Sequence, residues 1–140
     1  MTRKFDDKIG EIVNKYRNIP YKHNGRSLRG LDCLGLIIFF YQEFGIDLSE
    51  KDRTYSREWY REDPSIYLRE LLKVGRAVDF DDLQALDLVY FELLPDVVTH
   101  SGVMINDSEF IHILQKRNVE VASFNRFWRK KFAGARRLIK

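Results

Sequence analysis

Cysteine is almost absent from this sequence: Cys33 is the single one among 140 residues, so no internal disulfide can form. This excludes a small secreted scaffold stabilised by disulfides, and it leaves one thiol available for chemistry. Proline and glycine are also scarce, with three and eight residues, and no repeat or flexible linker divides the chain. We therefore predict a single domain over residues 1–140, which is long enough to bury a core.

Long hydrophobic runs are absent as well. No stretch of about 18 uncharged apolar residues occurs, which is the length that a membrane-spanning helix needs. The first seven residues include the basic pair Arg3-Lys4 and the acidic pair Asp6-Asp7 rather than the apolar segment of a secretion signal. We expect neither a membrane span nor a secretion signal.

Acidic residues are missing from one end of the chain. Seven of the 24 basic residues and none of the 21 acidic ones follow position 125, so the first 125 residues carry a net charge of −4. Such a basic end indicates either a polyanionic partner or a solvated charged surface. No motif of a nucleic-acid-binding module is present, so we expect no nucleic-acid partner.

The first third of the chain predicts two helices separated by a loop. Apolar residues recur at helical spacing from Phe5 to Tyr16, and Pro20 ends this helix. The polar, glycine-containing stretch 21–30 is expected to be an exposed loop. Asp32 can cap the next helix, which is apolar on every face from Cys33 to Tyr41 and is therefore expected to be buried.

The rest of the chain changes from helical to strand periodicity. Residues 49–64 form a polar connector with interspersed aromatic residues, and Pro64 opens a short helix. Beyond Gly75, four short β-branched or aromatic runs at 88–91, 102–105, 110–114 and 119–121 predict an antiparallel meander, which residues 133–139 close. We predict an α+β domain with the central helix packed on an antiparallel sheet.

Cys33 is placed where a thiol can become reactive. At the start of a buried helix, unpaired N–H groups and the helix dipole favour a thiolate and are expected to lower the thiol pKa. The alternative is that Cys33 is a small core residue, which is the usual role of a free cysteine. A nucleophilic thiol also needs a base, and the chain offers three histidines.

Two of these histidines, His100 and His112, are predicted to lie together. His100 follows a turn-like segment and precedes a strand. If residues 106–108 form a three-residue hairpin loop, Gly102 pairs with His112, and His112 lies diagonal to His100 on the same face. A two-residue loop would put the rings on opposite faces. A zinc site is the competing use of these residues, but their spacing lacks the short intervals of zinc ligands, so we expect no metal and no cofactor.

Residues 19–36, 83–91, 99–105 and 109–112 carry four motifs that, in this order, resemble those of the NlpC/P60 family of cysteine peptidases, and with the last segment the resemblance covers nearly the whole chain. Residues 19–36, which include Asp32-Cys33-Leu34-Gly35-Leu36, resemble the family's nucleophile motif. Residues 83–91 are similar to its strand entry, and residues 99–105 and 109–112 to its two histidine-bearing strands. The last segment, with Phe127-Trp128 and residues 132–137, is similar to the end of the family's domain.

The resemblance implies a papain-like domain that cleaves peptide stems of peptidoglycan, typically after D-γ-glutamate. It implies Cys33 as the nucleophile, His100 as the general base and His112 as the group that orients it. Tyr21 matches the family's tyrosine and is expected beside the thiolate and the oxyanion. Asp32 would cap the helix and could also face a substrate amine. The backbone N–H of Cys33 is the expected oxyanion donor.

The sequence departs from the family pattern at three positions. Leu34 replaces the usual serine after the nucleophile, which removes a hydrogen bond to a substrate amine. Asn24 replaces the first of two glycines. Leu86 replaces the glycine that normally precedes the aspartate, which indicates a different turn.

Two other functions stay open at this stage. One is an inactive member of the fold that serves as a wall-binding or phage-tail structural module, and the other is an acyltransferase or amidase that acts on another substrate. The connector, with Tyr55 and Trp59, would select the substrate if it lined the cleft, and would be uninformative if it packed on the core. We expect a monomer that is cytoplasmic, with a phage particle or release on lysis as the alternatives.

Overall fold

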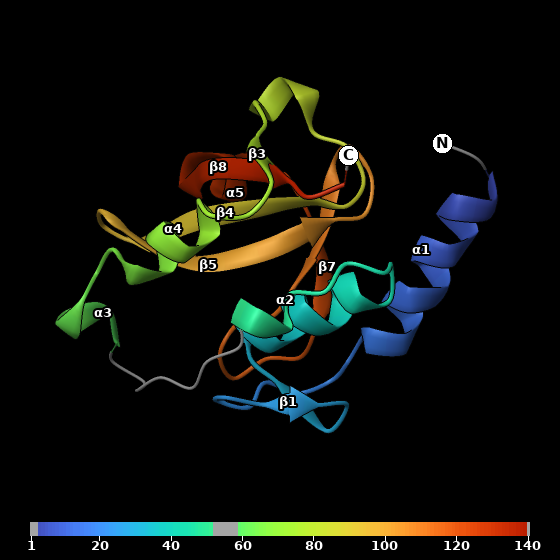
Figure 1. The fold of residues 1–140 in the computed structure, drawn as a ribbon, viewed down its shortest axis with the longest axis horizontal. Coiled ribbons are helices and arrows are strands. Elements are labelled where there is room, and N and C mark those ends of the chain that lie inside the picture. Colours follow the sequence, from blue (N-terminus) through green and yellow to red (C-terminus); the bar gives the residue numbers. More distant parts are fainter. Residues whose placement is uncertain (1–2, 52–58, 140) are drawn as a thin grey trace.

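A computed structural model describes residues 3–51 and 59–139 of the chain. The first helix, α1 (Arg3–Tyr16), buries a stripe that includes Ile9, Val13 and Tyr16, as its apolar spacing predicts. It ends before Asn18, whose φ of 74° is in the left-handed region and turns the chain toward Pro20. Figure 1 shows α1 flanking α2 at one side of the molecule.

The central helix, α2 (Cys33–Gln42), is the buried helix that the sequence predicts. Its N-cap is Asp32, whose side chain accepts a hydrogen bond of 2.8 Å from the Gly35 N–H. Six of its ten residues are buried, and the helix packs on strand β5. Glycine is required at position 35 because a Cβ there would collide with the Gly25 carbonyl oxygen.

The segment before α2 is more ordered than the exposed loop that we expected. Strands β1 (Arg26–Ser27) and β2 (Gly30–Leu31) form a small antiparallel hairpin, and Gly25 and Gly30 are buried. The physical reason is close packing: the Gly25 carbonyl lies against Gly35 of α2, and a side chain at Gly25 would collide with the backbone of Gly30 and Lys22. The hairpin therefore forms one wall at the start of α2 (Figure 1).

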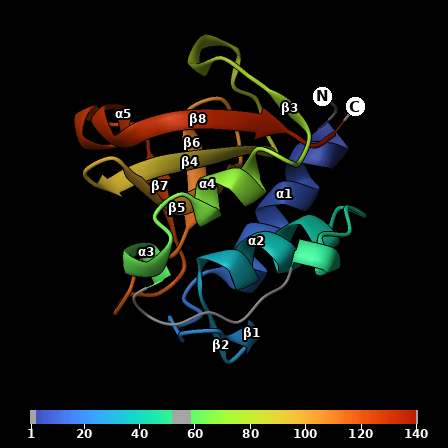
Figure 2. The same ribbon diagram turned by 60° about the vertical axis from the view of Figure 1, so that its left-hand side comes forward.

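The second half of the chain forms a six-stranded antiparallel sheet in the order β3-β8-β4-β5-β6-β7. Four strands follow one another as the predicted meander, and the last strand adds beside β4 (Figures 1 and 2). The strands are β3 (Arg76–Ala77), β4 (Asp87–Leu94), β5 (Val97–Met104), β6 (Glu109–His112), β7 (Glu120–Ser123) and β8 (Phe132–Arg137).

Short helices cover the connections. The 3₁₀ helix η1 (Ser49–Lys51) follows α2, and α3 (Trp59–Glu62) and α4 (Ile66–Leu71) lie between α2 and the sheet in sequence. Helix α4 contacts β5, as Figure 2 shows. The 3₁₀ helix η2 (Phe80–Asp82) precedes β4, and α5 (Arg126–Lys131) precedes β8 and contacts β4.

Two hydrophobic clusters use the two faces of the sheet. Alternate residues of β4 show the division: Leu88 belongs to the cluster with α1 and α2, whereas Val89 belongs to the cluster with Phe91 and Trp128. The first cluster is tied to the sheet by the Tyr41 hydroxyl, which donates to the Leu86 carbonyl over 2.8 Å. The α+β architecture with a central helix on an antiparallel sheet is confirmed.

Leu86 and Asn24 keep backbone conformations that glycine favours. Their φ values are 71° and 57°. Leu86 takes this left-handed conformation while its side chain is buried. In the described part of the chain, every helix is too short or too polar to cross a membrane.

Candidate active site

The two histidines of the β5–β6 hairpin form a hydrogen-bonded pair. Val103 pairs with Ile111 and Met104 with Phe110, which is the register of the predicted three-residue loop. His100 Nε2 lies 2.8 Å from His112 Nδ1. Gly102 leaves room for this approach, because a Cβ there would lie 3.3 Å from the His112 Cβ and 2.9 Å from the Ile111 carbonyl oxygen. One detail of the prediction was wrong: His100 lies within β5 rather than before it.

Aromatic side chains surround the histidine pair. Trp128 of α5 contacts both rings, with centroid distances of 5.6 Å to His100 and 5.0 Å to His112. Phe91, which pairs with His100 across β4 and β5, contacts the His100 ring. Burial, together with the neighbouring His112, holds the pKa of His100 well below its usual range. Both histidines are therefore neutral at pH 7.

The outer nitrogen of His112 faces β7. His112 Nε2 is buried without a hydrogen-bond partner, and Glu120 Oε1 lies 3.6 Å away. Glu120 also pairs with Arg117 over 3.1 Å. Burial, and then the positive charge of Arg117, lowers the pKa of His112 to about 4. The carboxylate of Glu120 is thus expected to favour the protonated form of His112, whereas the guanidinium of Arg117 disfavours it.

Cys33 opens α2 and is half-buried, and its sulfur has one side-chain hydrogen-bond partner within the part of the chain that the structure describes. That partner is the hydroxyl of Tyr67 in α4, at 3.4 Å from Sγ. The Tyr67 hydroxyl makes a second, short hydrogen bond with the hydroxyl of Ser101 in β5. The expectation of a lowered thiol pKa was wrong: burial raises the pKa of Cys33 to about 11, although the Tyr67 hydrogen bond acts in the opposite direction.

Tyr67 is the residue of this site that the sequence reasoning missed. The short helix after Pro64 was judged by its leucines and isoleucine, and a tyrosine among them carried no separate signal. In the structure, Trp59 stacks on the Tyr67 ring with centroids 5.7 Å apart. Trp59 therefore packs on the side chain that contacts the Cys33 sulfur, whereas Tyr55 falls outside the described residues.

Asp32 and Tyr21 differ in how the structure places them. The Asp32 carboxylate is fully buried and accepts from the Gly35 N–H, the Asn24 N–H and Arg26, whose Nη1 lies 2.7 Å away. Helix capping by Asp32 is confirmed. Tyr21 is half-buried and, like Cys33, packs against the first hydrophobic cluster, while the hydroxyl that is hydrogen-bonded to the Cys33 sulfur is that of Tyr67.

The sulfur and the histidine pair meet at β5 but from different sides. Ser101 completes the chain of hydrogen bonds from Cys33, and the adjacent residue His100 carries the imidazole. Because consecutive strand residues point to opposite faces, the two groups approach β5 from opposite directions. No hydrogen bond joins Cys33 to either histidine among residues 3–51 and 59–139.

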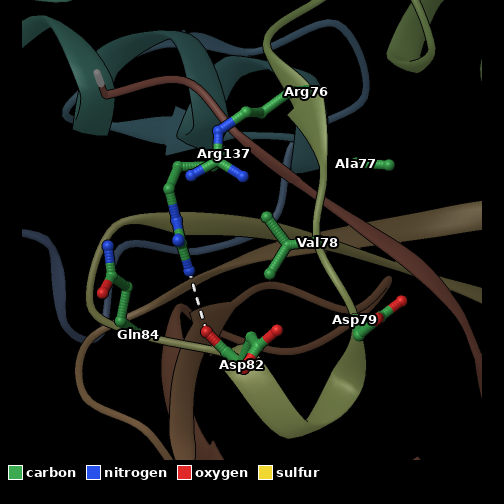
Figure 3. Close-up of a pocket in the computed structure, with 7 residues that line it drawn as sticks. All are labelled: Arg76, Ala77, Val78, Asp79, Asp82, Gln84 and Arg137. Carbon is green, nitrogen blue, oxygen red and sulfur yellow. Dashed lines mark hydrogen bonds between the residues drawn. The ribbon is translucent and has the colours of Figure 1, made fainter.

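A polar hollow with a volume of about 440 Å³ lies beside β3 and the end of β8. Arg137 points into it and donates to the Asp82 carbonyl (Figure 3). The same guanidinium forms an ion pair of 2.8 Å with the buried Asp87. Arg137 is thus used to hold the sheet edge. Across the described ranges, no three Cys, His, Asp or Glu side chains are grouped to hold a metal ion.

The basic end of the chain divides into structural and exposed cations. Arg136 donates to the carbonyls of Val74 and Gly75, and Arg137 pairs with Asp87, so both hold the sheet. The four cations of α5 form no ion pair with any residue that the structure describes. They are Arg126, Arg129, Lys130 and Lys131. The same helix carries Trp128, which contacts both histidine rings.

A cysteine at the start of a buried helix, packed on an antiparallel sheet that carries paired histidines, defines a papain-like α+β domain. The comparison with known families makes the assignment specific. The chain matches the NlpC/P60 family over residues 18–137 and belongs to that family.

Relatives with curated names and solved structures agree with this assignment. Murein DD-endopeptidase MepS/murein LD-carboxypeptidase of Escherichia coli K12 is 26% identical over 138 residues, which cover 95% of this chain and 64% of that protein. A gamma-DL-glutamyl hydrolase of Bacillus subtilis is 24% identical over 136 residues, covering 91% of this chain and 29% of that protein. The crystal structure of an NlpC/P60 family protein from Bacillus cereus superposes with a TM-score of 0.69 at 28% identity, covering 96% of this chain and 40% of that chain.

Proposed function

We propose that this protein is a cysteine peptidase that hydrolyses an amide bond in the peptide stems of peptidoglycan. Membership of the NlpC/P60 family supports this, as do the names of the murein endopeptidase and the gamma-DL-glutamyl hydrolase. The second name favours a bond that follows D-γ-glutamate. The observation that carries the proposal is the His100–His112 pair on β5 and β6, one residue from the hydrogen-bond chain that leads to Cys33.

The roles of the two histidines follow from which of their ring nitrogens already take part in a hydrogen bond. His100 uses Nε2 to bond His112, so its Nδ1 is the nitrogen left to take a proton. For Nδ1 to accept, the Nε2–H of His100 must donate to His112 Nδ1, and His112 must then carry its own proton on Nε2. His112 Nε2 is the nitrogen that faces Glu120. His112 is thus a positioning residue that selects the useful tautomer of His100.

The proposed reaction has two acyl-transfer steps. His100 Nδ1 takes the thiol proton as the Cys33 sulfur attacks the amide carbonyl carbon, and the backbone N–H of Cys33 donates to the oxyanion. The imidazolium then protonates the leaving amine as the C–N bond breaks, which leaves a thioester. Water attacks that thioester with His100 as base, and the carboxylate product and the neutral thiol are released.

The electrostatics favour proton transfer during the attack over a preformed ion pair. Burial raises the pKa of Cys33 to about 11 and lowers the pKa of His100, so the resting groups are a neutral thiol and a neutral imidazole. Their hydrogen bond is not made in the resting structure. The sulfur and the His100 ring approach β5 from opposite directions in the resting structure, so the mechanism requires a rearrangement that brings His100 Nδ1 within hydrogen-bond distance of the sulfur when substrate is bound.

Mass spectrometry of muropeptides tests this function. Purified protein and its Cys33→Ala variant are incubated with stems of the diaminopimelate type and of the lysine type. We expect cleavage by the unmodified protein, with product masses that place the bond after D-γ-glutamate, and at least about a 10³-fold lower rate for Cys33→Ala. Equal thermal unfolding of the two proteins is the control for folding. Rapid cleavage by folded Cys33→Ala would reject a thiol mechanism.

A further inference from the structure

Tyr67 contacts the sulfur that the proposed function uses as nucleophile, and no role has been given to it so far. Its hydroxyl lies 3.4 Å from Cys33 Sγ and is held on its other side by Ser101. Ser101 is buried, so its own hydroxyl depends on this hydrogen bond. The Tyr67 oxygen is therefore fixed between two groups that come from different parts of the fold, the start of α2 and the middle of β5.

The ring of Tyr67 is fixed as well as its hydroxyl. Trp59 stacks on it with an interplanar angle of 21°, and helix α4 packs on β5. Such stacking restricts the two side-chain torsions of a tyrosine, so the hydroxyl is held ready rather than recruited from solvent. A hydrogen-bond donor that is fixed in this way costs little reorganisation when charge develops on its partner.

The possible directions of the two hydrogen bonds suit a thiolate. A thiolate can only accept, so Tyr67 must donate its O–H to the sulfur once Cys33 is deprotonated. The Tyr67 oxygen can then accept the O–H of Ser101, and every proton of the chain points toward the negative sulfur. Resting on the proposed role of Cys33, we infer that Tyr67 is a further catalytic residue, whose hydroxyl, oriented by Ser101, stabilises the Cys33 thiolate.

The surroundings of Cys33 explain why such a donor is needed. Burial disfavours the thiolate, and the buried carboxylate of Asp32 at the helix cap disfavours it further. The groups that favour it are the Tyr67 hydroxyl first, then the backbone N–H of Leu34 and the more distant Arg26. Among the described residues, Tyr67 is thus the one whose side chain is in direct hydrogen-bond contact with the sulfur and opposes the effect of burial.

Alkylation of Cys33 by iodoacetamide tests the inference without any peptide substrate. The rate is measured from pH 7 to pH 9 for the unmodified protein and for Tyr67→Phe, which keeps the ring and its stacking on Trp59. Losing the donor raises the thiol pKa by about one unit, and the higher nucleophilicity of the remaining thiolate offsets part of the loss. We expect the rate to fall by about threefold to tenfold across this range.

Three further variants test whether slower alkylation comes from losing the Tyr67–Ser101 hydrogen bonds or from losing any phenol hydroxyl. Ser101→Ala is expected to slow alkylation less than Tyr67→Phe, and the double variant to be no slower than Tyr67→Phe, because Ser101 acts through Tyr67. Tyr16→Phe removes a phenol hydroxyl that bonds Glu43 far from the thiol, and it should leave the rate unchanged. Thermal unfolding of each variant checks that the fold is retained.

The opposite outcomes are equally clear. Faster alkylation of Tyr67→Phe would show that the phenol only covers the sulfur, and additive losses in the double variant would show that Ser101 does not act through Tyr67. Either result overturns the inference even if muropeptides are cleaved. Conversely, slower alkylation of Tyr67→Phe in a protein that cleaves no muropeptide would support the role of Tyr67 and reject the proposed substrate.

Discussion

The two halves of the candidate site are built on different principles. The histidine half is part of the sheet: the β5–β6 register, Gly102 and the aromatic rings of Phe91 and Trp128 fix His100 and His112 at 2.8 Å. The thiol half is assembled from separate elements, since the Cys33 sulfur at the start of α2 is hydrogen-bonded to a tyrosine of the short helix α4. The general base is thus positioned by the sheet itself, whereas the ionisation of the nucleophilic thiol depends on a contact with helix α4.

Substitution of the two histidines should sharpen this contrast most. We expect His100→Ala to lower the rate of muropeptide cleavage by about 10²- to 10⁴-fold, because it removes the general base. His112→Ala should be about tenfold to a hundredfold less severe, as expected for an orienting residue. Steady-state rates on a purified muropeptide measure both. Equal losses would contradict separate roles for the two rings.

The histidine half should also make stability depend on pH. His112 has a pKa of about 4 when folded and about 6.5 when unfolded, so between these values the unfolded chain binds more protons. The contribution is therefore fully present above pH 6.5 and is lost as pH falls toward 4, by about 3 kcal/mol at most.

Urea unfolding at pH 7.5, 5.5 and 4.5 measures this dependence. His112→Gln cannot titrate, and it should flatten the slope between pH 6.5 and 4.5 relative to the unmodified protein. A slope that His112→Gln leaves unchanged would show that other groups cause it.

The histidine half of the site could be predicted from the sequence to a greater extent than the thiol half. The histidine pair could be predicted because strand pairing has a period of two, so that a loop length fixes which side chains share a face. The cap of α2 by Asp32 is local and was predicted for the same reason. Tyr67 could not be predicted, since nothing local indicates which element a short surface helix will contact.

The thiol pKa illustrates a second limit. Sequence position at a helix start predicts a lowered pKa, but the amount of burial depends on residues such as Tyr67 and Trp59 that arrive from elsewhere in the chain. The hairpin at residues 26–31 was missed for a similar reason, because the polar composition of this segment hides Gly25 and Gly30, which pack on α2 and Lys22.

Substitution of the charged residues beside His112 should shift the pKa of His112 in opposite directions, and this effect is smaller than the previous ones. Arg117→Gln removes a cation that lowers the His112 pKa, so the pKa should rise, whereas Glu120→Gln removes a nearby carboxylate and should lower it. We expect shifts of about half a unit because both groups are partly exposed. NMR titration of the His112 ring measures them. Shifts in the same direction would contradict the arrangement.

The smallest effect is expected from the cations that α5 brings to the histidine half. If these four charges attract anionic wall polymer, Lys130→Gln with Lys131→Gln should weaken sedimentation with cell walls about threefold at low salt and not at high salt. Lys73→Gln with Lys116→Gln removes the same charge elsewhere and serves as the control. Equal effects of the two pairs would show that only net charge matters.

The central claim is that Cys33 forms a covalent acyl intermediate with the help of the histidine pair. Rapid acid quenching during muropeptide turnover, followed by peptide mass spectrometry, tests it most directly. The account predicts an acyl adduct on the peptide that contains Cys33, at much lower occupancy in His100→Ala during the early phase of the reaction. Continued turnover with no adduct on Cys33, together with an active Cys33→Ala variant, would contradict it.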